Sequence, residues 1–255
     1  LNEDLCETLS LAHDLGHTPF GHAGEEVLSK CMKKHGGFDH NIQTLRIVTY
    51  LEKKYYKFDG LNLSIETLDG LIKHNGPVKN ILKYKKILNK NFFNNKISFY
   101  SFPSLEAQVA AISDDIAYNN HDLEDGLRAG LFSIKKIGSI SSISKIIKKH
   151  SKNSNRFRKE ILISQIVRNL INIMVMDVIK TTSKNIQKQR PKTLNDIYKQ
   201  KFPLVDFSHK MKKIDKEIKS FLKYNMYNHK MVIKNTNNGK KIISDIFEYL
   251  LKNHK

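Results

Sequence analysis

Apolar residues recur with helical spacing along almost the whole chain, and the alternation typical of strands is almost absent. Leu1, Leu5, Leu9 and Ala12 follow an i, i+4 rhythm that Gly16 ends. Further helices are expected near residues 22–34, 40–54, 65–74, 105–128, 133–150, 156–184, 208–224 and 239–252, with a weaker one between 78 and 100. The pattern predicts an all-α fold.

Local residue choices mark several helix starts. Ser64 and Ser104 stand where an N-cap would accept the first free backbone N–H groups. The stretch 190–208 contains two prolines and is expected to form an irregular connection or a short hairpin.

Composition excludes some classes of protein. No apolar run reaches the roughly 18 residues that span a bilayer, so no membrane partner is expected. Cys6 and Cys31 lie among apolar neighbours and are interpreted as reduced, core-facing residues of a cytoplasmic protein. The net charge of +19 would attract nucleic acid or polyphosphate, but Lys far outnumbers Arg, which favours compositional drift in a Lys- and Asn-rich chain.

The stretch LAHDLGHTPFGH, from Leu11 to His22, is the densest cluster of chemically active residues. His13 and Asp14 are adjacent, so on a helix they point about 100° apart. They can reach one ion only at a helix end, which Gly16 supplies. Imidazole with carboxylate suits Mn, Fe, Mg or Zn. The alternative is a histidine on the helix dipole beside a capping aspartate.

His22 and Glu25 have the i, i+3 spacing that brings side chains into contact on a helix. A carboxylate beside an imidazole orients the ring and raises its pKa, which produces a proton donor for work near neutral pH. The alternative is a surface salt bridge.

Asp114, Tyr118 and Asp122 share one helix face at i, i+4 and i+8. A core face would carry Leu or Val, and a solvated face would seldom carry a central Tyr. The three side chains could supply a metal ligand, a stacking ring and a hydroxyl acceptor in line.

Four blocks in order resemble the bacterial deoxyguanosine triphosphate triphosphohydrolase-like proteins of the HD-domain superfamily. They are LAHDLGHTPFGHAGEE, GGFDHNIQTLRIVTYLE, GLNLSIETLDGLIKHNG and SLEAQVAAISDDIAYNNHDLEDGLRAGL, with a weaker block, FLKYNMYNHKMV, near the end. The resemblance implies an HD domain over 1–131 and a family-specific helical region over 132–255. It also implies hydrolysis of a deoxynucleoside triphosphate to a deoxynucleoside and inorganic triphosphate.

The resemblance also implies roles for individual residues. The divalent metal, Mg, Mn or another transition metal, would be held by His13, Asp14 and Asp114. His22 with Glu25 would form the catalytic pair near the α-phosphate, with His17 and His40 as further active-site histidines. Tyr118 would pack on the deoxyribose, and Asp122 would accept the 3′-hydroxyl.

The chain departs from the pattern at its start. The HD signature has an earlier histidine on a preceding helix, whereas none of the twelve residues before His13 is His. An N-terminal truncation or a degraded gene is therefore expected, and with at most three of four protein ligands the chain alone would bind metal poorly and could be inactive.

The mechanistic hypothesis is attack of metal-associated water on the α-phosphorus, with the His22–Glu25 pair or His40 protonating the leaving 5′-oxygen. Lys73 and His74 are candidates for neutralising the β- and γ-phosphates, or else form a helix C-cap cluster. Two alternatives stay open: an HD phosphodiesterase acting on a cyclic nucleotide or alarmone, and a degraded paralogue that only binds nucleic acid or a partner. Relatives of this kind are often homo-oligomers, and the basic region after residue 131 could hold an effector nucleotide or single-stranded DNA.

Overall fold

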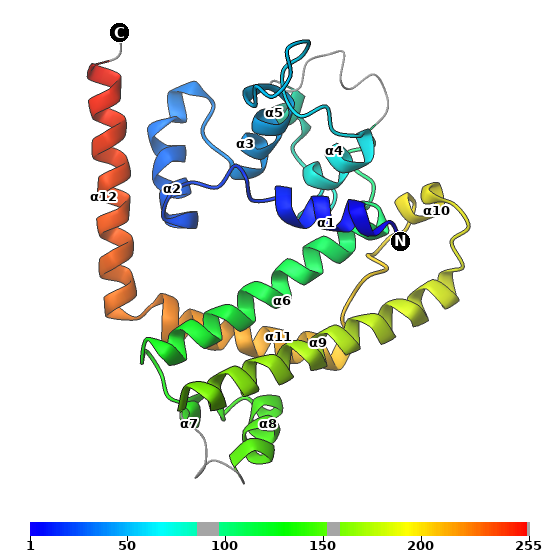
Figure 1. Cartoon of the computed structure of the whole chain (residues 1–255), viewed down its shortest axis with the longest axis vertical. Helices are drawn as coiled ribbons and strands as arrows, with labels where there is room; N and C mark the ends of the chain where they lie inside the picture. Colours follow the sequence, from blue (N-terminus) through cyan, green and yellow to red (C-terminus); the bar gives the residue numbers. More distant parts are fainter. Residues whose placement is uncertain (86–96, 152–158, 254–255) are drawn as a thin grey trace. The chain divides into compact units, whose positions relative to one another are not determined.

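The computed structural model describes residues 1–85, 97–151 and 159–253, and in these ranges every extended regular element is a helix (Figure 1). Strand-like pairing within the described ranges is limited to two isolated bridges, Lys53 with Gly60 and Tyr55 with Phe58. The prediction of an all-α fold is confirmed.

The α-helices that the structure describes follow the expected order. They are α1 (Glu3–Ala12), α2 (Gly21–Cys31), α3 (His40–Arg46), α4 (Ile65–Ile72), α5 (Ile81–Lys85), α6 (Leu105–Arg128), α7 (Ile134–Ile137), α8 (Ser141–Ser151), α9 (Lys159–Gln189), α10 (Leu194–Tyr198), α11 (His209–Leu222) and α12 (Lys230–Lys252). A 3-10 turn, Lys33–His35, follows α2, and π-helical segments, Ile47–Leu51 and Lys223–Tyr227, extend α3 and α11.

Both predicted serine caps are confirmed. The Ser64 hydroxyl accepts the Thr67 N–H at 3.3 Å at the start of α4, and the Ser104 hydroxyl accepts the Ala107 N–H at 3.3 Å at the start of α6. Each bond satisfies a backbone donor that lacks a partner inside the helix.

The stretch 190–208 is an irregular connection, as expected, except for the short α10, where Thr193 and Asp196 form a reciprocal capping box. Two expectations about helix boundaries were wrong. The expected helix 133–150 is divided into α7 and α8 around Gly138. The last helix begins at Lys230 rather than near 239. Part of the weak helix expected between 78 and 100, and the start expected at 156, fall outside the described residues.

The chain divides into two compact units. The first contains residues 1–111, 191–203 and 234–255, and the second contains 112–190 and 204–233. Helix α6 begins in the first unit and continues in the second, and the domain boundary expected at residue 131 stays a prediction.

In the first unit, α4 packs against both α1 and α3 (Figure 1). Helix α4 approaches α1 closely at Gly70, where a Cβ would lie only 2.6 Å from the Leu9 side chain. The core around this contact includes Leu9, Leu45, Val48, Leu68, Leu71 and Ala107. Since α1 and α3 are fixed on α4, the residues that follow α1 and open α3 are held together at one place.

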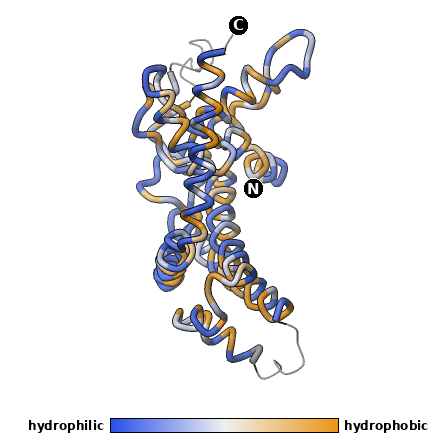
Figure 2. Tube along the Cα trace, turned by 90° about the vertical axis from the view of Figure 1, so that its left-hand side faces the viewer, coloured by the Kyte–Doolittle hydropathy of each residue, from blue (hydrophilic) through white to orange (hydrophobic). Residues whose placement is uncertain are grey.

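In the second unit, α9 packs against α8 and contributes a buried face. That face consists of Ile163, Ile166, Val167, Leu170, Met174 and Val178. Among the described helices, α9 is the one long and apolar enough to cross a membrane, judged by length and composition alone. No segment of this kind was expected from the sequence. Hydrophobic and hydrophilic stretches alternate along the tubes of Figure 2, as in helices that bury one face.

Candidate active site

The His13–Asp14 pair lies at the end of α1, as the spacing predicted. Ala12 is the last residue of the helix, and His13 is its C-cap. The turn that follows brings Nε2 of His13 to 3.4 Å from Oδ2 of Asp14. Nδ1 of His13 faces the Ser10 carbonyl oxygen at 2.9 Å, so Nδ1 carries the proton and donates it. Nε2 therefore presents its lone pair beside a carboxylate, and this donor set fits a divalent metal ion.

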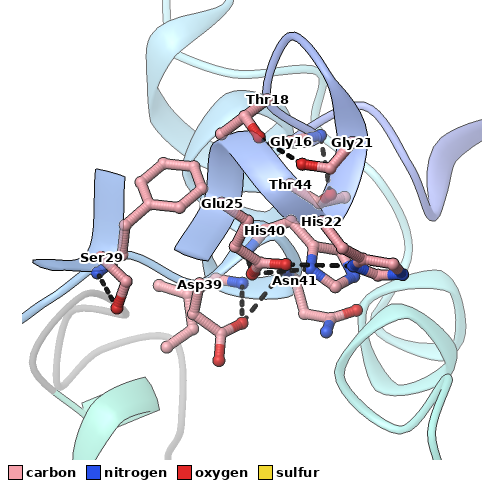
Figure 3. A network of polar contacts seen from close by, with 12 residues as sticks. Gly16, Thr18, Gly21, His22, Glu25, Ser29, Asp39, His40, Asn41 and Thr44 are labelled. Carbon is pink, nitrogen blue, oxygen red and sulfur yellow. Dashed lines mark hydrogen bonds and ion pairs between the residues drawn. The ribbon is translucent and has the colours of Figure 1, made fainter. Parts of the chain in front are cut away.

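The turn after the pair is locked onto α3 through Gly16 and Thr44 (Figure 3). Gly16 N–H donates to the Thr44 hydroxyl at 2.9 Å, and that hydroxyl donates to the His13 carbonyl at 2.9 Å. A Cβ at Gly16 would lie 2.2 Å from the His40 carbonyl oxygen, so the close approach requires glycine. The sequence pattern did not single out Thr44; its one signal is its place one turn after His40.

His74 lies against the metal pair. Its ring stacks on His13 with centroids 4.4 Å apart and planes 22° from parallel. A ring nitrogen of each lies within 4.8 Å of one on the other. The structure thus places the His74 ring directly beside the His13 ring.

Lys73 occupies a different environment from the one expected for a phosphate ligand. It is fully buried, with Nζ 2.6 Å from Oδ1 of Asp69 and 2.9 Å from the Ser101 hydroxyl. The ammonium also lies 4.8 Å from the centre of the Tyr198 ring. Burial raises the pKa of Asp69, and the hydrogen bond from Lys73 acts against that rise. These partners engage the buried Lys73 ammonium, which argues against its expected role as a phosphate ligand.

Glu25 joins two histidines from different helices (Figure 3). On α2, its Oε2 lies 3.3 Å from Nδ1 of His22, the i, i+3 contact that the spacing predicted. Its Oε1 accepts both Nδ1–H of His40 at 2.8 Å and the His40 backbone N–H at 2.9 Å. Asp39 caps α3 by accepting the N–H groups of Asn41 and Ile42, which fixes His40 at the first position of the helix.

His17 completes this cluster. Its ring stacks on His40 at 4.6 Å between centroids and meets His22 edge-on at 5.0 Å. The side chain of His22 is 72% exposed, whereas that of His40 is 15% exposed, so His22 is the member open to a bound molecule. Among the described residues, Nδ1 of His17 is buried without a hydrogen-bond partner.

Electrostatics within the cluster favour a charged Glu25 and a neutral His17. Burial raises the pKa of Glu25, but the hydrogen bonds from the His40 backbone and from the His40 and His22 rings outweigh it, so the pKa is lowered. Burial, with the neighbouring His40, lowers the pKa of His17.

The second unit carries the other predicted face, on α6. Asp114 is half-buried and Tyr118 is about half exposed. Asp122 accepts a short hydrogen bond from the Tyr227 hydroxyl, and Tyr118 also bonds to Asp122. Burial raises the pKa of Asp122, while the two tyrosine hydroxyls lower it. Sequence reasoning missed Tyr227, although it lies in the weak block FLKYNMYNHKMV.

Comparisons with known proteins show what the chain is similar to. Residues 1–119 match the HD domain family, and residues 205–255 match the phosphohydrolase-associated domain. The deoxyguanosinetriphosphate triphosphohydrolase-like protein of Pelagibacter ubique is 53% identical over 253 residues, covering 99% of this chain and 68% of that protein. The proteins of the same description from Parvibaculum lavamentivorans and Bartonella tribocorum are each 43% identical, covering 98% and 99% of this chain and 64% of their own length. The chain thus spans about two thirds of these relatives.

Proposed function

Since the chain belongs to the deoxyguanosinetriphosphate triphosphohydrolase-like family of HD-domain phosphohydrolases, we propose that its protein hydrolyses a deoxynucleoside triphosphate, of the dGTP type, to deoxynucleoside and inorganic triphosphate. The observation that carries the proposal is the Glu25 carboxylate shared by His22 and His40, in the same unit as the His13–Asp14 pair. A proton donor and a metal-binding pair together are what cleavage of a phosphate ester requires.

HD domains typically bind a divalent metal, and His13 with Asp14 fits one here. Asp114 on α6, which the resemblance implies as a ligand, and His74, which stacks on His13, would be further residues available to hold the ion. Bound Mg, Mn or another transition metal would supply positive charge to the α-phosphate oxygens.

His22 is the proposed proton donor. Its exposed ring is oriented by the carboxylate of Glu25, whose Oε2 lies 3.3 Å from Nδ1 of His22. As water adds to the α-phosphorus, the bond from phosphorus to the 5′-oxygen breaks, and the proton on His22 goes to that oxygen. The attacking water loses a proton to solvent, and the His22 ring takes up a proton again before the next turnover. His40 holds the carboxylate in place from the other side through two hydrogen bonds.

The α6 face is the proposed sugar site. Tyr118 packs against the deoxyribose and disfavours a 2′-hydroxyl, and Asp122 accepts the 3′-hydroxyl. Tyr227 orients Asp122 through the hydrogen bond it donates. The separate observation that Asp122 is already held by two tyrosine hydroxyls supports a fixed acceptor rather than a mobile surface carboxylate.

The test is hydrolysis of dGTP by the full-length protein with Mn²⁺ in ¹⁸O-labelled water. We expect deoxyguanosine and inorganic triphosphate, with the label in triphosphate, because water attacks phosphorus rather than C5′. The His22→Gln variant should lose most of kcat, whereas His35→Gln, at an exposed histidine in the same unit, should retain it. Cleavage of a cyclic nucleotide or an alarmone, with dGTP left intact, would support the phosphodiesterase alternative instead.

A further inference from the structure

The geometry points to a second metal site, for a transition-metal ion of the zinc type, formed by the active-site imidazoles of His17, His22 and His40. Each ring offers one nitrogen, and the three nitrogens all lie within 4.8 Å of one another. Tetrahedral zinc with bonds of about 2.0–2.1 Å would place them roughly 3.3 Å apart. The His22 side chain is 72% exposed, so its ring has room to move toward the other two and close that difference.

Glu25 gives this cluster the outer shell that metal-binding histidines have. Its two oxygens face Nδ1 of His22 and Nδ1 of His40, and Nδ1 is the donor in both contacts. The proton on Nδ1 leaves the lone pair on Nε2 of each ring free to bind metal. Glu25 is itself held by the His40 backbone N–H, so the orientation of both rings is set before an ion arrives.

His17 supplies the third nitrogen and the remaining geometric support. It stacks on His40 and meets His22 edge-on, so it lies beside both other ligands. Its buried Nδ1 has no hydrogen-bond partner among the described residues. A buried nitrogen without a partner loses its hydration on folding and gains no hydrogen bond in return. The hydrogen bond between Gly16 and Thr44 fixes the turn on which His17 lies, and so holds the His17 backbone close to α3.

The ligand set also selects the class of ion. Three imidazole nitrogens suit Zn²⁺, Co²⁺ or Ni²⁺, whereas Mg²⁺ prefers oxygen ligands. The His13–Asp14 pair contains a carboxylate and accepts harder ions, so the two sites differ in preference. A zinc ion on Nε2 of His22 also occupies the atom that would carry the proton. Zinc at the cluster would therefore inhibit hydrolysis; this consequence rests on the proposed function, but the binding itself does not.

The test is titration with Co²⁺ followed by visible absorption, in the His13→Ala/Asp14→Asn background that disables the first pair. We expect one equivalent of Co²⁺ to produce the intense bands of tetrahedral coordination, and Zn²⁺ but not Mg²⁺ to displace it. His17→Ala should abolish the bands. Glu25→Gln should weaken binding about 10–100-fold, the usual effect of losing an outer-shell carboxylate. The matched control His35→Ala should leave the titration unchanged.

Circular dichroism of each variant checks that the fold persists, and Glu25→Gln keeps the proposal falsifiable if His17→Ala fails to fold. The proposal is overturned if the background protein binds no Co²⁺, if the bands are those of octahedral coordination, or if Glu25→Gln and His35→Ala bind equally well. Triphosphate release by the wild-type protein is measured separately, so loss of the metal site and loss of the proposed activity are distinguished.

Discussion

Replacing Glu25 by Ala should destabilise the first unit far more than the same change at its neighbour Glu26. Glu25 accepts two short hydrogen bonds from His40, at 2.8 and 2.9 Å, and its side chain is only 19% exposed. Hydrogen bonds to a charged group contribute about 1.5–3 kcal/mol each. The bond to the exposed His22 ring is long, at 3.3 Å, and adds little.

Taking the lower value for the two His40 bonds, we expect a loss of about 3 kcal/mol in the free energy of unfolding. Urea denaturation followed by circular dichroism measures it. With a slope of about 2 kcal/mol/M, the midpoint falls by roughly 1.5 M.

Glu26→Ala is the control, because Glu26 forms only surface ion pairs with Lys30 and Lys240. Its change should be small and should disappear at high salt. Equal midpoint shifts for the two variants would refute the claim that Glu25 ties α2 to α3.

Three further outcomes follow from single contacts. Gly16→Ala should cost about 1–3 kcal/mol of unfolding free energy in urea, since its Cβ would lie 2.2 Å from backbone atoms; an unchanged midpoint would contradict the close packing. Lys73→Ala leaves buried Asp69 uncompensated and should cost about 3–5 kcal/mol, whereas Lys73→Met with Asp69→Leu should recover most of it; failure of the pair to recover would contradict a buried ion pair. Burial raises the pKa of Asp122 and the Tyr227 hydroxyl lowers it, so Tyr227→Phe should raise this pKa further, which an NMR titration measures. Because the folded pKa then lies further above the unfolded value, the stability that this carboxyl contributes is present at low pH and is lost as pH rises through the folded pKa.

The sequence predicted those parts of the site that depend on local spacing. The His22–Glu25 contact follows from i, i+3 geometry, and the His13–Asp14 pair follows from a helix end near Gly16. Both are set within a few residues, where the periodicity of the helix fixes which side chains meet.

The parts it missed depend on contacts between segments far apart in the chain. Asp69 lies one helical turn before Lys73, but helical spacing gives no sign that Lys73 is also buried beneath Tyr198, because Tyr198 follows it by more than a hundred residues. Tyr227 reaches Asp122 in the same long-range way. The last helix was expected to begin near residue 239, yet Gly239 lies inside α12, where its missing side chain admits the ring of Phe20.

The most direct test of the account is the phosphorus product of dGTP hydrolysis by the full-length protein with Mn²⁺, followed by ³¹P NMR. The account predicts inorganic triphosphate and deoxyguanosine in equal amounts, with release reduced at least about 100-fold in His22→Gln, in line with the usual contribution of a positioned proton donor. Pyrophosphate or monophosphate as the primary product, or full activity in His22→Gln, would contradict it.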